Sequence, residues 1–295
     1  MLDHERTTGQ VRARVVGRAL TRSREGWYTG GVGRLTEVAP GVLVATSSFE
    51  LTTSTVVAGA DGGCLLIDPG VTVAELARLA ADLRELGLRP TAAWSTHPHW
   101  DHVLWSRELG DAPRYAAPAA VAVAEAERAE LARAAQQSAP GHDLSLLGLL
   151  TPLPEMDTAA AIPWDGPGAR LIVHDGHAPG LGAVFLAGAG VLVAGDMCSD
   201  VEIPLLDLTA PDPLGDYRVG LERLAAVAGV RQVVPGHGHV GDAGEFRRRL
   251  SADAAYLDAL MLGKPAGDPR LSGSAPEWLR VTHDEQVRYV RGPGS

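Results

Sequence analysis

Short runs of alternating hydrophobic and polar residues follow residue 34, and a period of two along the chain predicts β-strands. Residues 35–46 contain two such runs around a Pro-Gly pair, and residues 54–60 and 64–68 flank an Asp-Gly-Gly sequence. Both intervening sequences are typical of tight turns. We therefore predict two β-hairpins at the start of the fold.

The period then changes to that of an amphipathic helix. Thr72 and Glu75 have the spacing of a capping box, in which each side chain accepts a hydrogen bond from a free backbone N–H of the first helical turn. Gly87 is a typical helix end. The apolar positions between these signals are Val73, Leu76, Leu79, Leu83 and Leu86. We expect this helix to cover one face of a sheet.

Further strand-like and helix-like segments follow without an internal repeat. We expect strands at 91–96, 114–117, 169–174, 183–187 and 191–194, and helices at 103–109, 118–138, 215–227 and 244–262. Residues 143–157 are apolar but contain prolines, which fits either a lip over a functional site or packing between two halves of the fold. The tail, 263–295, is loop-like with one helix near Pro276.

Length and composition describe a globular chain. With 295 residues and 45% hydrophobic content, it can bury a full core as one large domain or as two tightly joined halves. We predict a main domain at 34–262. It is preceded by an Arg-rich N-terminal segment, 1–33, that we expect to be flexible, and followed by a C-terminal extension, 263–295.

The net charge and the cysteine content limit which partners and which cellular location are expected. The net charge of −10 disfavours a nucleic-acid partner, because phosphate backbones need a clustered basic surface. The start lacks the apolar core of a signal peptide, and the longest apolar run, 181–195, is too short to cross a membrane. Cys64 and Cys198 lie far apart in sequence, so we expect no disulfide scaffold and a reducing, cytoplasmic location.

The candidate chemistry lies directly after the strand predicted at 91–96, in the sequence His97-Pro98-His99-Trp100-Asp101-His102. Three imidazoles and a carboxylate in six residues are too concentrated to be a coincidence in a chain with ten histidines. The proline cannot donate to a sheet, so the strand should end here and the imidazoles should converge on the following loop. Such ligands suit zinc, iron or manganese rather than calcium or magnesium.

This loop resembles the H-x-H-x-D-H motif of the metallo-β-lactamase superfamily. The residues at the motif positions are His97, His99, Asp101 and His102. Three further ligand-type residues occur in the family's order, each after a predicted strand and beside glycine or proline: His177, Asp196 and His237. The resemblance covers roughly residues 35–262. It implies an α/β (α+β) fold with αββα layers, in which two mixed β-sheets are flanked by helices.

The resemblance also implies a dinuclear site with two Zn²⁺ ions as cofactors, or with iron or manganese in their place. In such a site the first ion is held by His97, His99 and His177, the second by Asp101, His102 and His237, and Asp196 bridges both. The two carboxylates among these ligands, Asp101 and Asp196, are the catalytic candidates. Asp68 would support the metal loop from behind; a simple turn-forming role before Pro69-Gly70 is the alternative.

By the same resemblance, the activity is hydrolysis of an ester, thioester or lactone of a small molecule by a hydroxide shared between the metals. An Asp at position 196 is similar to glyoxalase II and lactonase members, whereas the best-known lactam-cleaving branch has Cys there. The alternatives are β-lactam or phosphodiester hydrolysis, and an iron-dependent persulfide dioxygenase that uses His97 or His99 with His177 and Asp196. Neither a nucleic acid nor a membrane is expected as partner, and the oligomeric state stays open.

Several residues near the candidate ligands have simpler interpretations. Cys198, two positions after Asp196, is expected to be a small buried hydrophobe rather than a metal ligand. Trp100 and Trp105 are expected to pack beneath the metal loop, with a pocket wall as the alternative for Trp100. His174 is expected to lie behind the ligands or at the surface.

Overall fold

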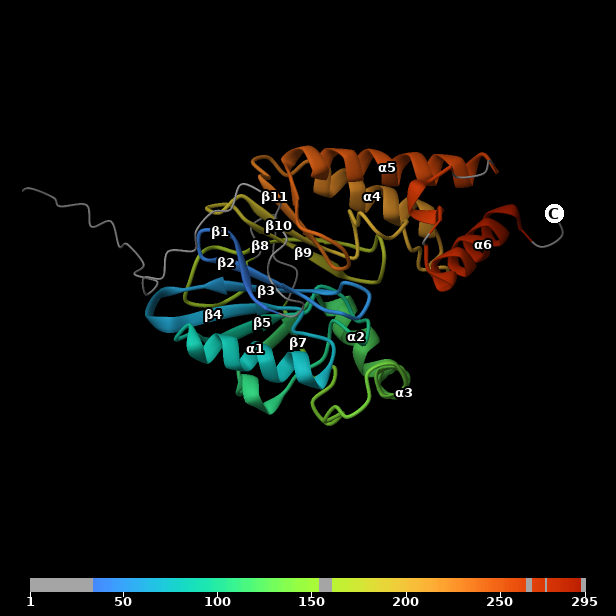
Figure 1. The fold of residues 1–295 in the computed structure, drawn as a ribbon. Coiled ribbons are helices and arrows are strands. Elements are labelled where there is room, and N and C mark those ends of the chain that lie inside the picture. Colours follow the sequence, from blue (N-terminus) through green and yellow to red (C-terminus); the bar gives the residue numbers. More distant parts are fainter. Residues whose placement is uncertain (1–33, 154–160, 264–266, 274, 293–295) are drawn as a thin grey trace, which may run out of the picture.

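The structure, a computed structural model, describes residues 34–153, 161–263, 267–273 and 275–292. The predicted Arg-rich segment, 1–33, lies outside the described residues. Two mixed sheets are stacked face to face, with helices on both outer sides (Figure 1). The predicted αββα layering is therefore confirmed.

The first sheet has its strands in chain order. They are β1 (Thr36–Ala39), β2 (Val42–Thr46), β3 (Thr53–Ala58), β4 (Gly63–Ile67), β5 (Arg89–Trp94), β6 (Arg114–Ala116) and β7 (Thr151–Pro152). The two predicted hairpins are β1–β2 and β3–β4, and both pairs are antiparallel. From β4 onward the strands run parallel, so their carboxyl ends share one edge of the sheet.

The second sheet has the order β12-β11-β10-β9-β8. Its strands are β8 (Arg170–His174), β9 (Leu181–Leu186), β10 (Val191–Gly195), β11 (Gln232–Pro235) and β12 (Gly241–Asp242). The helices are α1 (Val73–Glu85), α2 (Pro118–Ala126), α3 (Arg128–Ser138), α4 (Pro213–Ala225), α5 (Ala243–Met261) and α6 (Glu277–Arg291). The 3₁₀ helices are η1 (Ala60–Gly62), η2 (Arg107–Leu109) and η3 (Pro269–Leu271).

The alternation along each strand divides the core into layers. On β4, Leu65 and Ile67 face the core between the sheets, whereas Leu66 faces α1. On β9, Val184 faces that same central core, whereas Phe185 faces the helices of the second half. Because successive strand side chains point to opposite faces, every central strand contributes to two cores.

Helix α1 begins as predicted, with the reciprocal hydrogen bonds of a capping box between Thr72 and Glu75. The predicted apolar stripe was too wide, since only its central leucines are buried. Val73, the first residue of the helix, is 44% exposed, and Leu86, its C-cap, is 42% exposed.

The helix predicted at 118–138 is two helices, so that prediction was wrong in one respect. Glu127 leaves the helical conformation between α2 and α3. Val121 of α2 packs with Ala116 of β6, whereas Ala124 of α2 shares a cluster with Leu131 of α3 and Leu147.

Two other predicted segments have less regular structure. Of the helix predicted at 103–109, only the 3₁₀ turn η2 forms. Leu147, in the apolar segment predicted at 143–157, is buried against Val103 and Leu104, so it packs within the first half of the fold rather than between the two halves. Residues 154–157 of that segment lie outside the described residues.

The C-terminal tail contains the predicted helix, and that helix belongs to the core of the second half. Helix α6 begins directly after Pro276, lies beside α5 and buries Leu279 completely (Figure 1). No helix in the described part of the chain is both long enough and apolar enough to cross a membrane.

Candidate metal centre

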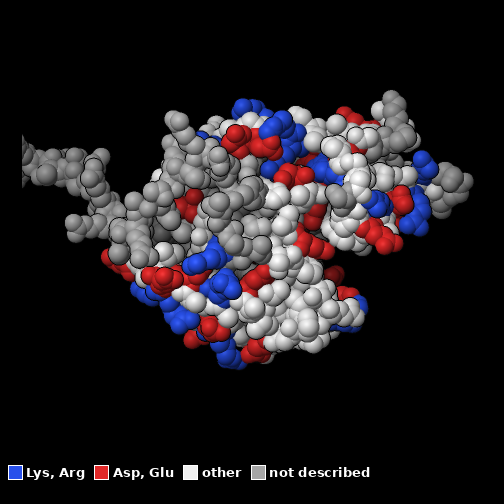
Figure 2. Space-filling model, viewed as in Figure 1, with Lys and Arg blue, Asp and Glu red and all other residues white. Residues whose placement is uncertain are grey.

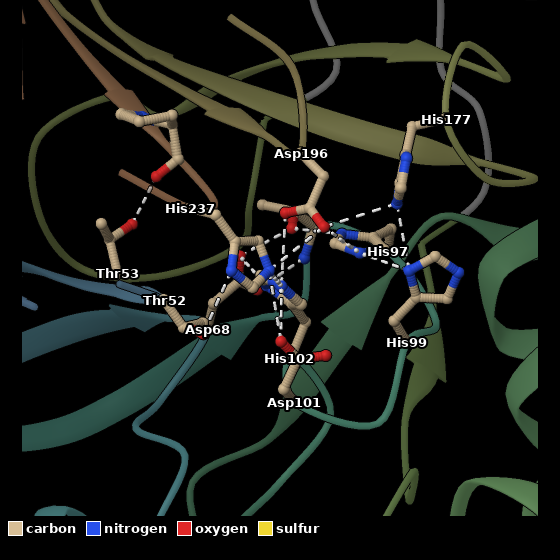
Figure 3. Close-up of polar contacts among 12 residues, drawn as sticks. Thr52, Thr53, Asp68, His97, His99, Asp101, His102, His177, Asp196 and His237 are labelled. Atoms are coloured by element: carbon tan, nitrogen blue, oxygen red, sulfur yellow. Dashed lines mark hydrogen bonds and ion pairs between the residues drawn. The ribbon is translucent and has the colours of Figure 1, made fainter. Parts of the chain in front are cut away.

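All seven predicted ligands follow strands and meet at the edge between the two halves (Figure 3). Four lie on the loop after β5, and the other three follow β8, β10 and β11 of the second sheet. The strands of both sheets therefore aim their carboxyl-end loops at one place, as is common for sites in α/β folds.

The first cluster, called the three-histidine group, contains His97, His99 and His177 together with Asp196. Its ligand atoms all lie within 4.8 Å of one another. His99 Nδ1 is 3.1 Å from His97 Nε2 and 3.0 Å from His177 Nε2. The two halves of the fold thus contribute to one cluster.

The second cluster, called the mixed group, contains Asp101, His102 and His237, again within 4.8 Å. His102 Nε2 lies 3.3 Å from His237 Nε2, and Asp101 Oδ2 lies 3.3 Å from His237 Nε2. All three residues are buried.

Asp196 lies between the two groups. Its Oδ2 is 3.3 Å from His97 Nε2 and 3.4 Å from His177 Nε2, and it is also 3.3 Å from His237 Nε2. Its Oδ1 is 3.3 Å from His102 Nε2, yet it makes no hydrogen bond within the described residues. A single carboxylate therefore contacts imidazoles of both groups.

The donor atoms fit metal ions. Tetrahedral ligands about 2.0–2.1 Å from zinc are about 3.3 Å from one another, and the facing atoms in both groups have this spacing. Within the three-histidine group, His97 and His177 both turn Nε2 toward His99 Nδ1, and one proton cannot link all three nitrogens well. A buried carboxylate oxygen without a hydrogen bond points to the same conclusion.

The outer ring nitrogens are held by the protein, which fixes the orientation of each imidazole. His177 Nδ1 donates to the carbonyl of Leu205 at 2.9 Å, and His237 Nδ1 donates to the carbonyl of Glu50 at 3.0 Å. Nε2 of both rings therefore faces the ligand clusters; His177 offers a lone pair there, and His237 does so once its Nε2 proton is released.

Asp68 supports the metal loop as predicted. Its Oδ1 accepts from the Thr96 N–H at 2.8 Å, and its Oδ2 accepts from Thr96 Oγ1 at 2.6 Å and lies 3.1 Å from His102 Nδ1. The Thr96 hydroxyl in turn lies 3.0 Å from His97 Nδ1. The backbone of Asp68 has a φ of 48°, an uncommon conformation that these contacts hold in place.

The three-histidine group favours neutral imidazoles. Burial lowers the pKa of His97 well below its usual value and the pKa of His99 to about 4. The pKa of His177 is also lowered, again because burial disfavours the charged ring. These side chains are therefore ready to bind a cation at neutral pH.

The mixed group behaves in the opposite way. Burial opposes protonation of His102, but Asp196, Asp101 and Asp68 outweigh it and raise the pKa to about 9. For His237, the carboxylates of Asp196, Asp101 and Glu202 likewise overcome burial and raise the pKa well above its usual value. Without a metal, this group holds protons in the place of a cation.

Two further carboxylates near the mixed group were not predicted. Glu202 is 6% exposed, its Oε1 lies 3.6 Å from His237 Nδ1, and burial raises its pKa to about 8. Burial also raises the pKa of Glu50. Neither residue has a local motif; the only signal was that Glu202 follows Asp196 within the same loop.

Gly236 leaves room for the central carboxylate. A Cβ atom at this position would overlap Asp196 Oδ1. The Gly236 N–H donates to the carbonyl of Gly195 at 2.6 Å, so the ends of β10 and β11 are held together beside Asp196. Glycine is needed here because of a close approach rather than an unusual backbone angle.

The neighbouring residues mostly have structural roles. Cys198 is buried away from both groups, and burial raises the pKa of its thiol well above the usual value. Trp105 is buried and donates to the Gly110 carbonyl, as expected for packing. Trp100 contacts Phe49 edge to face, with ring centroids 5.3 Å apart, and packs partly on the cluster around Leu147.

The sequence model of the metallo-beta-lactamase superfamily matches residues 48–239. This match spans more than half of the chain and includes both groups, so the chain belongs to the metallo-β-lactamase superfamily. A search among curated proteins gave no match.

Solved structures share the fold. A beta-lactamase domain protein from Burkholderia ambifaria is 21% identical, with a TM-score of 0.61, and the match covers 80% of this chain and 76% of that one. A metallo-beta-lactamase family protein from Thermus thermophilus is 25% identical, with a TM-score of 0.59 and coverage of 77% and 83%.

A third similar structure is the stereoselective inverting sec-alkylsulfatase Pisa1 from a Pseudomonas species. It is 18% identical with a TM-score of 0.62, and the match covers 88% of this chain but 50% of the sulfatase chain. The shared part is the fold, since the identity is too low to carry the activity across.

Proposed function

We propose that the protein is a metal-dependent hydrolase with two zinc ions, one in each group, acting on a small molecule. The observation that carries this proposal is the position of Asp196, whose carboxylate lies within 3.4 Å of imidazole nitrogens in both groups. A bridging anion offsets the repulsion between two dications and keeps them close.

Bound metal ions would supply Lewis acidity, which lowers the pKa of water to near 7 and polarises the oxygen of a scissile bond. The chain's own residues hold and orient these ions. His97, His99 and His177 offer neutral nitrogens, while Asp101 and Asp196 offer buried carboxylates whose pKa values the neighbouring imidazoles hold below the usual range despite burial. Asp101 and Asp196 are thus anionic at neutral pH.

The bond to be cleaved is proposed to be an ester, thioester or lactone. The support is the ligand set itself: Asp196 occupies the position between the groups, as in the glyoxalase II-like and lactonase-like resemblance, while Cys198 is buried away from it. A β-lactam or a phosphodiester is the less favoured substrate.

A small-molecule substrate is favoured over a nucleic acid. On the face in Figure 2, the Lys and Arg side chains of the described residues are interspersed with Asp and Glu. This distribution and the net charge of −10 offer little support for phosphate-backbone binding. Both cysteines are free and buried, which supports a reducing compartment such as the cytoplasm.

The test is a substrate screen with protein loaded separately with zinc, manganese and iron. p-Nitrophenyl esters, acyl thioesters and lactones are compared with a β-lactam and a phosphodiester, and metal content is measured on the same samples. Hydrolysis with about two ions per chain is the expected result. One iron per chain with oxygen uptake and no hydrolysis would instead identify the persulfide dioxygenase alternative.

A further inference from the structure

The loop after Asp196 carries a backbone group that orients a candidate ligand. The Leu205 carbonyl accepts the hydrogen bond from His177 Nδ1 at 2.9 Å. Residues 203–207 belong to neither a helix nor a strand, so no regular backbone ladder holds this carbonyl in place. Something else must fix the peptide group between Leu205 and Leu206.

That contact comes from the C-terminal helix. The N–H of Leu206 belongs to the same peptide group as the Leu205 carbonyl, and it donates to Gln286 Oε1 of α6 at 2.7 Å. Gln286 is fully buried, at 0% exposed, although it is separated from Leu206 by 80 positions in sequence. The peptide group is therefore held on both sides, by a candidate metal ligand and by Gln286.

The orientation of the glutamine amide is itself fixed. Gln286 Nε2 donates to the hydroxyl of Tyr256 on α5 at 2.7 Å, and that hydroxyl lies 2.9 Å from His283 Nδ1. With Tyr256 accepting from the amide and donating to His283, each group uses one donor and one acceptor in a consistent direction. A flipped amide would lose both the Leu206 and the Tyr256 hydrogen bonds.

We propose that Gln286 is a positioning residue for the metal centre: through the Leu205–Leu206 peptide group it sets the orientation of His177 and thereby metal binding at the three-histidine group. The inference rests on the proposed metal-binding function. Helix α6 would then influence metal binding, although it carries no candidate ligand and Gln286 lies 80 positions from Leu206 in sequence. Its effect is confined to one of the two groups, because His237 takes its orienting hydrogen bond from the Glu50 carbonyl instead.

The experiment is a zinc titration of metal-free protein by calorimetry, with the two binding steps assigned by His99→Ala and Asp101→Ala. Gln286→Met keeps a side chain of similar length but removes both hydrogen bonds. We expect it to weaken the three-histidine step by about 10–100-fold, the usual cost of removing a contact behind a metal ligand, and to leave the mixed-group step unchanged.

Leu279→Ala is the matched control, because Leu279 is also fully buried on α6 but lies outside this hydrogen-bond chain. It should lower thermal stability without changing either binding step. Gln286→Glu, protonated in this buried place, keeps one acceptor and one donor and should restore the three-histidine step. Should Gln286→Met fail to fold, Tyr256→Phe, which leaves Gln286 with one hydrogen bond fewer, is expected to weaken the same step by a smaller factor.

Hydrogen exchange at the Leu206 amide reports the contact directly, and its protection should fall in Gln286→Met and persist in Leu279→Ala. Loss of that protection with both zinc affinities at the wild-type level would overturn the inference, as would equal weakening of the three-histidine step by Leu279→Ala. If wild-type protein binds zinc at both steps but hydrolyses no substrate, the proposed hydrolase function fails while the positioning role of Gln286 still stands. Wild-type protein that binds no zinc would refute both.

Discussion

The three-histidine group and the mixed group lie side by side and share Asp196, yet their imidazoles have opposite protonation preferences. Desolvation acts on both groups, although His99 is less buried than the other four rings, and alone it would lower every histidine pKa. The pKa of His99 is lowered to about 4, whereas that of His102 is raised to about 9. The comparison shows that burial alone does not decide the protonation state of an imidazole in this site.

The difference follows from the number of carboxylates around each group. His102 lies within 3.5 Å of Asp68, Asp101 and Asp196. His99 has no carboxylate among its hydrogen-bond or ion-pair contacts in the described structure, and its close neighbours are the rings of His97 and His177. The three-histidine group can therefore bind a cation directly, whereas the mixed group must first release protons.

Removing the shared carboxylate should have the largest effect. We expect Asp196→Ala to lower hydrolytic turnover by roughly 100-fold or more, because both groups lose the anion that links them. The measurements are turnover, metal content by elemental analysis and circular dichroism to verify the fold. A variant with two bound metals and near wild-type turnover would show that Asp196 does not bridge the groups.

Asp68→Asn tests the difference between the two groups. It removes the negative charge beside His102 while keeping a side chain of nearly the same shape at position 68. We expect zinc binding at the mixed group to weaken by about 10–100-fold, because the outer nitrogen of His102 loses its carboxylate partner. The three-histidine step in the same titration is the internal control and should change less. Equal weakening of both steps would mean that Asp68 acts mainly through Thr96 and the loop backbone.

The pH dependence of zinc affinity should differ between the groups. His102 in the metal-free protein has a raised pKa of about 9, so below pH 9 it carries a proton that the metal must displace. Affinity at the mixed group should therefore rise about tenfold per pH unit up to about pH 9 for each proton released. Affinity at the three-histidine group should stay flat from pH 6 to 8, because its imidazoles are already neutral. Calorimetric titrations at pH 6, 7 and 8 measure both slopes, and parallel slopes would contradict the comparison.

The smallest expected effect is that of Glu202→Gln. The carboxylate of Glu202 is one of the groups that raise the pKa of His237, so its neutralisation should ease proton release from the mixed group. Because the pKa of Glu202 is about 8, the effect should appear above that pH: we expect zinc affinity at the mixed group to increase by roughly threefold at about pH 9, with no change at the three-histidine group. A decrease would indicate that Glu202 is needed to orient the His237 ring.

Residues that are close in sequence could be recognised as a site from the sequence, and residues brought together only by the fold could not. Four candidate ligands occupy one loop, so their convergence was predictable from local spacing alone, and the hairpins and the capping box of Thr72 were equally local. The other ligands needed a family resemblance to be recognised. Glu202 and Gln286 could not be found this way, because their contacts join segments whose spacing carries no pattern.

Two predictions were wrong for a related reason: the unbroken helix at 118–138 and the burial of Val73. At Glu127 the tertiary structure overrides helical propensity, whereas Val73 is helical as predicted but is not covered by a neighbouring element. A sequence period identifies an apolar face but does not say how far the opposing sheet extends beneath it.

Each group takes ligands from both sheets, so a bound metal ion would connect the two halves of the fold. A cation held by the β5 loop and by His177 or His237 ties together segments up to 136 positions apart, so it acts as a removable crosslink between the halves. Such a crosslink binds the native state and not the open chain, which adds RT ln(1 + [L]/Kd) to the free energy of unfolding, about 2.7 kcal/mol at a hundredfold excess over Kd. Chelation should then lower the melting temperature, because the native state loses this crosslink.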